Sequence, residues 1–331
     1  MPDPRTENAE PMNPLTVAPS APIFVVLNVS SGSQDAVAAR AIIEGVLGEA
    51  GREHRVIPVA NPADLQAIAR RTVDEARACS GVVVAAGGDG TINAVAQATL
   101  GSGCPFGVLP QGTFNYTSRA HGIPATTADA ARLLVTARAH PVQVGFVNDR
   151  AFLVNASLGL YPKLLEDREA HKRQFGRSRL VAFCSGLIVL LRERRQLRLL
   201  IEQGGETRAL RTPTLFVGNN RLQLEQLGIA HAPMLDQGSL VAITLRPVGT
   251  LTMLGLLARG AFGQLGEADS VDSFAFKRIT VTPGRRRSRR GVKVATDGEI
   301  AWLQAPIEFR IAPDPLYLLK PEPDSATMAA A

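Results

Sequence analysis

The 331-residue sequence is poor in several features that mark common protein classes. Its three cysteines, Cys79, Cys104 and Cys184, are odd in number and lack the close spacing of a zinc or redox motif. This excludes a disulfide scaffold and favours reduced, buried thiols. Only 5% of the residues are aromatic, and none interleave with basic residues, so we expect no nucleic-acid partner. The longest apolar stretch, Leu180–Leu191, falls well short of the ~20 residues needed to span a bilayer.

Lysine is also scarce, because only five of the 36 basic residues are lysines, and the formal net charge is +6. An arginine-rich surface favours partners that carry phosphate, such as nucleotides, nucleic acids or anionic lipids. The densest run, Arg285–Arg290, is either a solvated loop or a contact with anionic phospholipid headgroups. The predicted membrane contacts are Arg285, Arg286, Arg287, Arg289 and Arg290.

Both ends of the sequence differ in composition from the rest. Residues 1–21 are rich in proline and lack a basic segment followed by an apolar one, which predicts a disordered leader rather than a signal peptide. Residues 321–331 are predicted to be a disordered tail. We therefore expect a cytoplasmic protein that touches the inner face of the membrane as a peripheral protein.

Apolar runs and amphipathic segments alternate between residues 22 and 143. The runs Ile23–Leu27, Gly81–Ala86 and Phe106–Leu109 are typical of buried parallel strands. Segments with helical periodicity follow them, which predicts a doubly wound α/β domain over residues 22–143. The other expected elements are a strand at Arg55–Val59 and helices at Gln34–Glu49 (with Val37, Ile42, Val46 and Leu47 buried), Asp64–Arg77, Ile92–Leu100 and Thr126–His140 (capped by Thr126 or Thr127).

The pattern changes after residue 144, where short β-branched segments are separated by turns. This pattern predicts a largely antiparallel second domain over residues 144–311. Two helices are expected within it, at Pro162–Arg195 and Thr250–Ala261. The expected strands are Phe146–Val147, Ala151–Ala156, Leu197–Glu202, Thr214–Gly218, Leu240–Arg246, Arg278–Thr282, Gly291–Ala295 and Ile307–Ile311.

The segment GGDGT (residues 87–91) lies between a predicted strand and a predicted helix. Its glycines have no Cβ to block a ligand, and the helix start offers unpaired N–H groups, which together suit a di- or triphosphate. It is neither a G-x-G-x-x-G turn nor a P-loop. Asp89 would repel phosphate unless it bound a metal, a ligand hydroxyl or a cation. The alternative is a tight turn in which Asp89 caps the helix.

Two further loops, Asn28–Gly32 and Pro110–Asn115, follow neighbouring predicted strands. Loops at the carboxyl ends of neighbouring strands in a doubly wound sheet meet at one crevice. Together with GGDGT they predict a nucleotide crevice.

A fourth candidate, Asp297-Gly298-Glu299, lies far along the chain. Asp-Gly between strands is the strongest short signal for a β-hairpin. The alternative is that a carboxylate here takes the proton of an acceptor hydroxyl during phosphoryl transfer. The spacing alone leaves both interpretations open.

GGDGT at 87–91, LPQGTFNYTSRAHGIP at 109–124 and DGE at 297–299 occur in the order seen in the diacylglycerol kinase catalytic-domain superfamily, which the chain resembles over nearly all of residues 22–320. The resemblance implies an NAD kinase/diacylglycerol kinase-like fold. In such a fold residues 312–320 complete the α/β domain, and residues 144–311 form a β-sandwich acceptor domain. It also implies an ATP- and Mg²⁺-dependent lipid kinase that phosphorylates a diacylglycerol-like or sphingoid-like hydroxyl.

The resemblance also implies roles for single residues. Asp297 would be the general base, assisted by Glu299, and Asp89 would be a third catalytic residue. The ATP site would be formed by Asn28, Ser31, Gly32, Gly87, Gly88, Asp89, Gly90, Thr91, Gly112, Thr113 and Asn115.

The sequence departs from the family pattern at four positions, where it has Val29, Ala94, Tyr116 and Gln143. The last three replace carboxylates and put a family-type acidic metal network in doubt, which indicates a divergent branch. Two alternatives follow: an NAD kinase-like enzyme, which shares GGDGT, and a non-catalytic membrane-associated protein that binds nucleotide or lipid. The sequence leaves the oligomeric state open, and a homodimer is one state that it allows.

Overall fold

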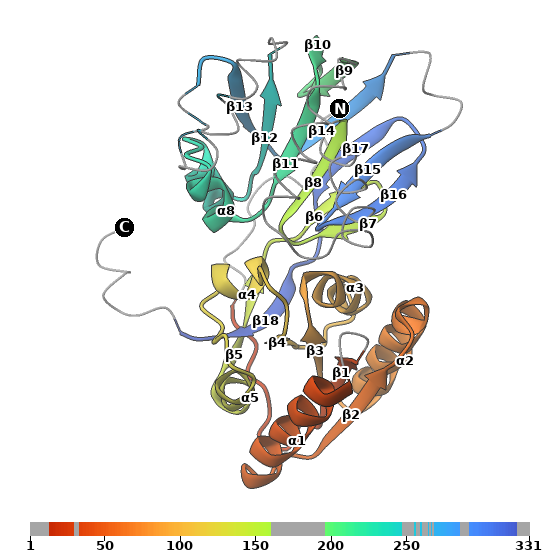
Figure 1. The fold of residues 1–331 in the computed structure, drawn as a ribbon, viewed down its shortest axis with the longest axis vertical. Helices are drawn as coiled ribbons and strands as arrows, with labels where there is room; N and C mark the ends of the chain where they lie inside the picture. Colours follow the sequence, from red (N-terminus) through yellow and green to blue (C-terminus); the bar gives the residue numbers. More distant parts are fainter. Residues whose placement is uncertain are drawn as a thin grey trace. The chain divides into compact units, whose positions relative to one another are not determined.

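The computed structural model describes residues 13–29, 33–159, 196–246, 268–284 and 291–322, with single residues between 255 and 266. The chain divides into two compact units, Met1–Val142 with Asp314–Ala331 and Gln143–Pro313 (Figure 1). The predicted helix Pro162–Arg195 lies outside the described residues, as does most of the predicted helix Thr250–Ala261.

The first unit is built on a six-stranded sheet with the strand order β2-β1-β3-β4-β18-β5. The neighbours from β2 to β18 pair in parallel, and β5 is antiparallel to β18. β18 comes from the end of the chain and lies between β4 and β5, so the sheet needs both ends of the sequence. The strands are β1 (Ile23–Asn28), β2 (His54–Val59), β3 (Val82–Gly87), β4 (Phe106–Pro110), β5 (Arg138–Val142) and β18 (Leu316–Lys320).

Two pairs of helices cover this sheet. α1 (Ser33–Glu49) packs beside α5 (Thr127–Thr136), and α2 (Leu65–Ala78) packs beside α3 (Asp89–Thr99). Two shorter elements, η1 (Pro62–Asp64) and α4 (Tyr116–Ala120), lie in the connections.

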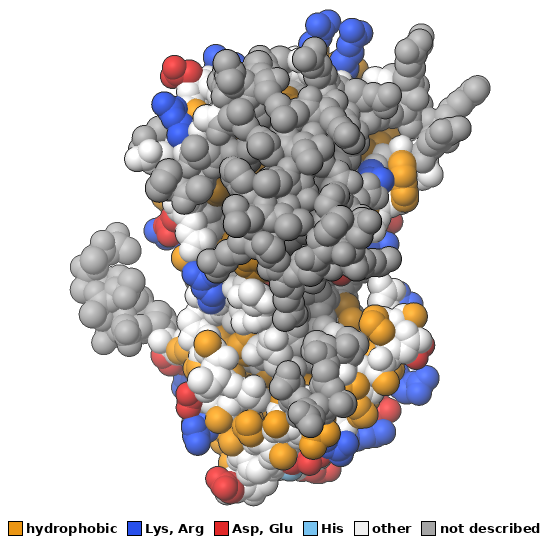
Figure 2. Space-filling view, in the orientation of Figure 1, with side chains coloured by type: hydrophobic (Ala, Val, Ile, Leu, Met, Phe, Trp, Pro, Cys, Tyr) orange, Lys and Arg blue, Asp and Glu red, His pale blue; other side chains and the backbone are white. Residues whose placement is uncertain are grey.

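The buried face of α1 differs from the predicted one. Val37 and Ile42 were expected in the core, but they are 69% and 42% exposed, whereas Ile43 and Leu47 are fully buried. The helix carries apolar residues on several sides, so periodicity alone did not identify the face that packs. Hydrophobic side chains therefore lie among charged ones on the surface of this unit (Figure 2).

The predicted helix Thr126–His140 is wrong at its end, because α5 stops at Thr136 and residues 138–142 form β5. Thr126 caps this helix as predicted, since its side chain accepts a hydrogen bond from the N–H of Asp129. The segment after the helix becomes a strand because β18, far along the chain, pairs with it. Local periodicity does not report such a partner.

The described part of the second unit contains two six-stranded antiparallel sheets and two short helical segments, α8 (Arg221–Gln226) and η2 (Ala232–Gln237). The first sheet contains, in spatial order, β10 (Glu206–Thr212), β9 (Leu197–Gln203), β14 (Arg278–Pro283), β17 (Ile307–Ile311), β6 (Gly145–Val147) and β7 (Arg150–Phe152). The second contains β13 (Val271–Phe276), β12 (Leu240–Leu245), β11 (Thr214–Gly218), β8 (Asn155–Gly159), β15 (Val292–Thr296) and β16 (Glu299–Leu303).

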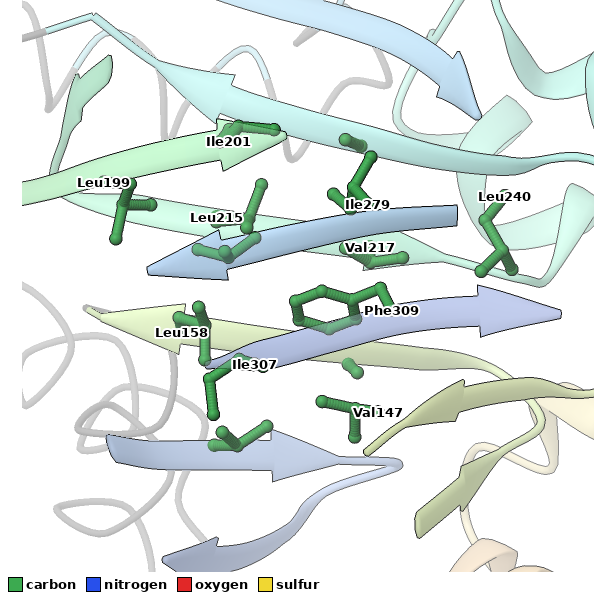
Figure 3. Close-up of a cluster of buried hydrophobic side chains, with 14 of the residues drawn as sticks. Val147, Leu158, Leu199, Ile201, Leu215, Val217, Leu240, Ile279, Ile307 and Phe309 are labelled. Carbon is green, nitrogen blue, oxygen red and sulfur yellow. The ribbon is translucent and has the colours of Figure 1, made fainter. Parts of the chain in front are cut away.

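The core of the second unit lies between the two sheets (Figure 3). Alternate residues of each strand point into it, among them Leu158, Val217 and Phe309, which are fully buried. Each such side chain contributes about 1.5–3 kcal/mol through burial of apolar surface. A second cluster, which includes Leu224 and Val241, packs α8 and η2 onto the other face of the second sheet.

Several strands of the second unit differ from the prediction. The expected strand Ala151–Ala156 is divided into β7 and β8, and β10, β13 and β16 were not predicted. β10 has mostly exposed side chains and takes its strand conformation from its pairing with β9. Its sequence therefore lacks the alternation on which the prediction rested.

The first unit should lose stability in mild acid because of His121. Burial lowers the pKa of His121 to about 4, and the positive charge of Lys320 on β18 acts in the same direction. An unfolded histidine titrates near ~6.5, so the unfolded chain binds a proton first as the pH falls. The free energy of unfolding should therefore fall between pH 6.5 and 4, by up to about 3 kcal/mol.

Urea unfolding of the wild type and of His121→Gln at pH 7.5 and pH 5 measures this contribution. The wild type should lose more stability than the variant between the two pH values. An equal loss in the two proteins contradicts the assignment to His121.

Candidate functional site

Three loops of the first unit leave the same edge of the sheet. β1, β3 and β4 are neighbours and run parallel, so the loops that follow them begin at their common carboxyl edge. These are the segments predicted to form a nucleotide crevice, and they are joined by direct contacts. Nδ2 of Asn28, at the end of β1, donates to Oγ1 of Thr91 at 2.8 Å. The N–H of Gln111 donates to the carbonyl oxygen of Gly87 at 2.8 Å.

The two glycine loops touch backbone against backbone at Gly88 and Gly112. A Cβ on Gly112 would lie 2.9 Å from the Cα of Gly88 and 2.8 Å from Oδ1 of Asn115. A Cβ on Gly87 would lie 2.7 Å from the Cβ of Thr91. No side chain fits at Gly87 or Gly112 without movement of a neighbour, which explains the glycines at these two positions.

Asn115 shapes the loop that carries it. Its backbone is left-handed, with a φ of 47°, a conformation that asparagine adopts more readily than most residues. Its Oδ1 accepts a hydrogen bond from the N–H of Gly112 at 2.9 Å, and its Nδ2 donates to the Gly112 carbonyl oxygen at 2.9 Å. Both ends of this predicted ATP-binding side chain are therefore used within the loop.

Asp89 is the first residue of α3. The alternative in which its carboxylate caps the helix is wrong, because Gly88 is the N-cap residue and no side-chain cap bond forms. Burial raises the pKa of the Asp89 carboxyl, and the backbone N–H groups of Thr117, Asn115 and Tyr116 oppose that rise. Asp89 thus connects the GGDGT turn to the start of α4. Its Oδ1 is buried and has no hydrogen-bond partner among the described residues.

Gln111 was not predicted as a site residue. Its Nε2 is buried and, within the described part of the chain, has no hydrogen-bond partner. An unpaired buried donor therefore lies on one glycine loop, and the unpaired acceptor of Asp89 lies on the other. Sequence gave no signal for this, because a glutamine in a loop is usually solvated.

The Asp297-Gly298 pair forms the two-residue turn between β15 and β16, where Thr296 pairs with Glu299. Both turn residues have positive φ, 47° and 90°, as a type I′ turn requires, so the hairpin interpretation is confirmed. Glu299 is exposed at the start of β16.

The Asp297 side chain also accepts hydrogen bonds from backbone N–H groups at the start of β8. Its Oδ2 accepts the N–H of Leu153 at 2.7 Å, and its Oδ1 accepts those of Val154 and Asn155 at 2.9 and 2.8 Å. These three bonds fix the orientation of the carboxylate. They could not be foreseen, since backbone amides carry no side-chain signature.

Two of the family departures have structural roles here. Tyr116 stacks on Phe114, with ring centroids 5.9 Å apart. In the second unit, Nε2 of Gln143 donates to Oδ1 of Asn219 at 2.7 Å and to the Ser239 carbonyl oxygen at 3.0 Å.

Other predicted residues are placed elsewhere or lie outside the described residues. Gly90 and Thr113 belong to the two glycine loops, whereas Ser31, Gly32 and the run Arg285–Arg290 are outside the described part. Among the described residues, no group of three His, Cys, Asp or Glu side chains could hold a metal ion. The described helices include none long and apolar enough to cross a membrane.

Comparisons with known proteins agree with this arrangement. Residues 22–147 match the family model of the diacylglycerol kinase catalytic domain. A protein from Pseudomonas aeruginosa (strain UCBPP-PA14), described as "Probable lipid kinase YegS-like", is 42% identical over 119 residues, which cover 35% of this chain and 38% of that protein. One of the same description from Klebsiella pneumoniae (strain 342) is 40% identical over 92 residues, 27% of this chain and 31% of that protein. The chain thus matches about a third of the length of these curated relatives.

Solved structures extend the likeness over both units. A crystal structure described as a diacylglycerol kinase from Bacillus anthracis str. Sterne has a TM-score of 0.68 at 18% identity and covers 91% of this chain and 97% of its own. Another structure from that organism has a TM-score of 0.71 at 19% identity, with coverage of 92% and 99%. At these identities the likeness shows the fold.

Gly112→Ala should separate the two glycine loops. The added methyl group has no space beside Gly88 and Asn115, so we expect the free energy of unfolding of the first unit to fall by about 1–3 kcal/mol. Gly45→Ala is the matched control, because nothing lies within 4 Å of its Cβ position on α1. That variant should gain up to about 1 kcal/mol through helix propensity. Urea unfolding measures both, and equal stability of the two variants would contradict the close approach.

Proposed function

We propose that this chain is an ATP- and Mg²⁺-dependent lipid kinase that transfers the γ-phosphoryl group to a lipid hydroxyl. The match of residues 22–147 to the diacylglycerol kinase catalytic domain supports this proposal. The relatives described as probable lipid kinases support a kinase with a lipid acceptor. The structural observation on which the proposal rests is the backbone contact between Gly88 and Gly112. This contact joins two glycine loops at the carboxyl edge of a parallel sheet.

The glycine loops suit the phosphates of ATP. The glycines let the two loops meet at the carboxyl edge of the sheet, which brings backbone amides together where a phosphate can bind. α3 begins in the same turn, so its unpaired N–H groups and positive dipole end favour an anion. Nε2 of Gln111, which is buried and has no partner among the described residues, is a further donor for a phosphate oxygen. Asn28 and Asn115 support these loops through their bonds to Thr91 and Gly112.

The residues present fit a magnesium ion that arrives with ATP. Mg²⁺ in kinases is held through one or two carboxylates together with substrate phosphates and water. Asp89 offers a carboxylate oxygen that has no partner among the described residues, and we assign the ion to it. When bound, Mg²⁺ neutralises charge on the phosphates. A metal also explains a carboxylate in a turn that otherwise favours anions.

Asp297 is the proposed general base. In the transfer, the bond between the γ-phosphorus and the oxygen that bridges to the β-phosphate breaks, and a bond forms between that phosphorus and the lipid hydroxyl oxygen. The hydroxyl proton passes to the Asp297 carboxylate, and ADP leaves. The three backbone N–H bonds fix the direction in which the carboxylate faces, and the role of base itself comes from the family resemblance of the DGE segment. A contact of Arg285–Arg290 with anionic lipid stays a prediction from the sequence.

The proposal predicts transfer of ³²P from γ-labelled ATP to a lipid in mixed micelles that contain Mg²⁺. The panel contains diacylglycerol, monoacylglycerol, ceramide, a sphingoid base and phosphatidylglycerol, with NAD as a separate arm. Label in at least one lipid supports the proposal. Label in NAD alone would show an NAD kinase-like enzyme, and ATP binding without any product would show a binding protein.

Asp297→Asn should reduce kcat by at least about 10²-fold, because a general base contributes that much or more, while ATP binding is unchanged. The matched control is Asp149→Asn, since Asp149 lies exposed in the two-residue turn between β6 and β7 and should keep full activity.

Asp297→Asn also replaces the carboxylate that accepts three backbone N–H bonds with an amide. The substitution can therefore lower the stability of the fold as well as remove the base. The melting temperature separates the two effects. A folded Asp297→Asn protein with near-normal turnover would remove Asp297 as the base.

A further inference from the structure

Two polar side chains are buried on the face of β8 that points away from the core between the sheets. Ala156 and Leu158 belong to that core, so the alternation of a strand places Asn155 and Ser157 on the opposite face. Asn155 is 4% exposed and Ser157 is fully buried. On this face of the sheet β8 carries polar side chains, whereas β11 and β12 carry apolar side chains that pack under α8 and η2.

Neither side chain has its hydrogen bonds complete. Nδ2 of Asn155 donates to Oε1 of Gln223 on α8 at 3.1 Å, which fixes the amide. Oδ1 of Asn155 and Oγ of Ser157 are both buried and have no hydrogen-bond partner among the described residues. Buried polar atoms of native proteins are rarely left unpaired, so two such oxygens without a partner among the described residues indicate a bound group or a water beside them.

The pair lies beside the turn that carries Asp297. The N–H of Asp297 donates to the Asn155 carbonyl oxygen at 2.9 Å, and the N–H of Asn155 donates back to Oδ1 of Asp297 at 2.8 Å. Ser157 lies opposite Ala295, two residues before Asp297 on the neighbouring strand. A molecule whose hydroxyl reaches the Asp297 carboxylate therefore lies beside β8, the strand that carries Oδ1 of Asn155 and Oγ of Ser157.

We propose that Asn155 and Ser157 bind the polar part of the acceptor and select a lipid alcohol that carries a second hydrogen-bond donor next to the hydroxyl that receives phosphate. The selection rests on the lipid kinase function proposed above. Oδ1 of Asn155 can only accept, so its partner must be an O–H or N–H group, whereas the Ser157 hydroxyl can donate or accept.

This chemistry divides the candidate acceptors into two classes. Diacylglycerol has one hydroxyl, and its remaining polar atoms are ester oxygens that only accept, so it leaves Oδ1 of Asn155 unpaired. Monoacylglycerols, sphingoid bases and the glycerol headgroup of phosphatidylglycerol each keep a second O–H or N–H group. A site built around a buried acceptor discriminates strongly against a ligand that lacks the matching donor.

The sharpest probe is a pair of lipids that differ at one hydroxyl, 1-octanoylglycerol and its 2-O-methyl ether. The ether keeps the oxygen and has a methyl group in place of the donor proton, so the Ser157→Ala and Asn155→Leu variants separate the loss of the donor from the added bulk. We expect the wild type to prefer 1-octanoylglycerol by about tenfold or more, both in kcat/KM and in the binding constant from titration calorimetry. Ser157→Ala and Asn155→Leu should each reduce this preference and leave the KM for ATP unchanged.

Stability distinguishes recognition from a structural role. Ser157→Ala removes an unpaired hydroxyl, so its melting temperature should equal or exceed that of the wild type while the preference falls. The matched control is Ser273→Ala on the same sheet, where the hydroxyl lies 2.8 Å from Nδ1 of His231. The control should melt lower and keep the full preference.

The outcomes separate this inference from the proposed kinase function. Equal use and equal binding of the two lipids would overturn the inference, with a buried water as the occupant, while transfer to either lipid would leave the kinase function standing. A binding preference that Ser157→Ala reduces, without transfer to any lipid of the panel, would support the site and overturn the kinase function.

Discussion

The first unit depends on the approach of two backbones where Gly88 and Gly112 meet. A Cβ on Gly112 would lie 2.9 Å from the Cα of Gly88, so the distance between the loops is set by the absence of side chains. Other contacts form around this one, because Asn115 closes its own loop onto Gly112 and Asp89 faces the amides at the start of α4. The parallel register of the strands makes this possible, since it starts both loops at one edge.

The second unit uses a carboxylate for a similar purpose. The type I′ turn after β15 needs only residues that tolerate positive φ, for which asparagine or glycine would serve as well as aspartate. Asp297 adds three backbone N–H bonds to the start of β8, so one side chain connects two segments that are separated by more than half of the second unit. The hairpin and the candidate base are therefore the same feature, and the two interpretations from sequence do not exclude each other.

The predictable parts of this protein were those whose cause is local. The apolar strands beside the glycine loops, the Thr126 cap and the Asp-Gly turn each follow from neighbouring residues, and all three are present. The errors share one cause, which is contact with residues that lie far along the chain. β5 exists because β18 pairs with it, β10 because β9 does, and α1 buries Ile43 rather than Ile42 because of its neighbours in the fold. The oxygens of Asp89, Asn155 and Ser157 that have no partner in the described part of the chain were equally unpredictable, since burial is a property of the whole fold.

Those unpaired oxygens are also the strongest physical argument that the two units bind ligands. Each buried, unpaired polar group costs about 1–3 kcal/mol, a sizeable part of the 5–15 kcal/mol by which domains are typically stable. Asp89 carries such an atom beside the glycine loops of one unit, and Asn155 and Ser157 carry two beside the Asp297 turn of the other. An apolar side chain would remove the cost at Ser157 without loss of volume, so packing alone does not account for its hydroxyl. A cation at Asp89 and an acceptor with a donor group at Asn155 would pair these oxygens, so the atoms that cost stability are the ones we propose as ligand contacts.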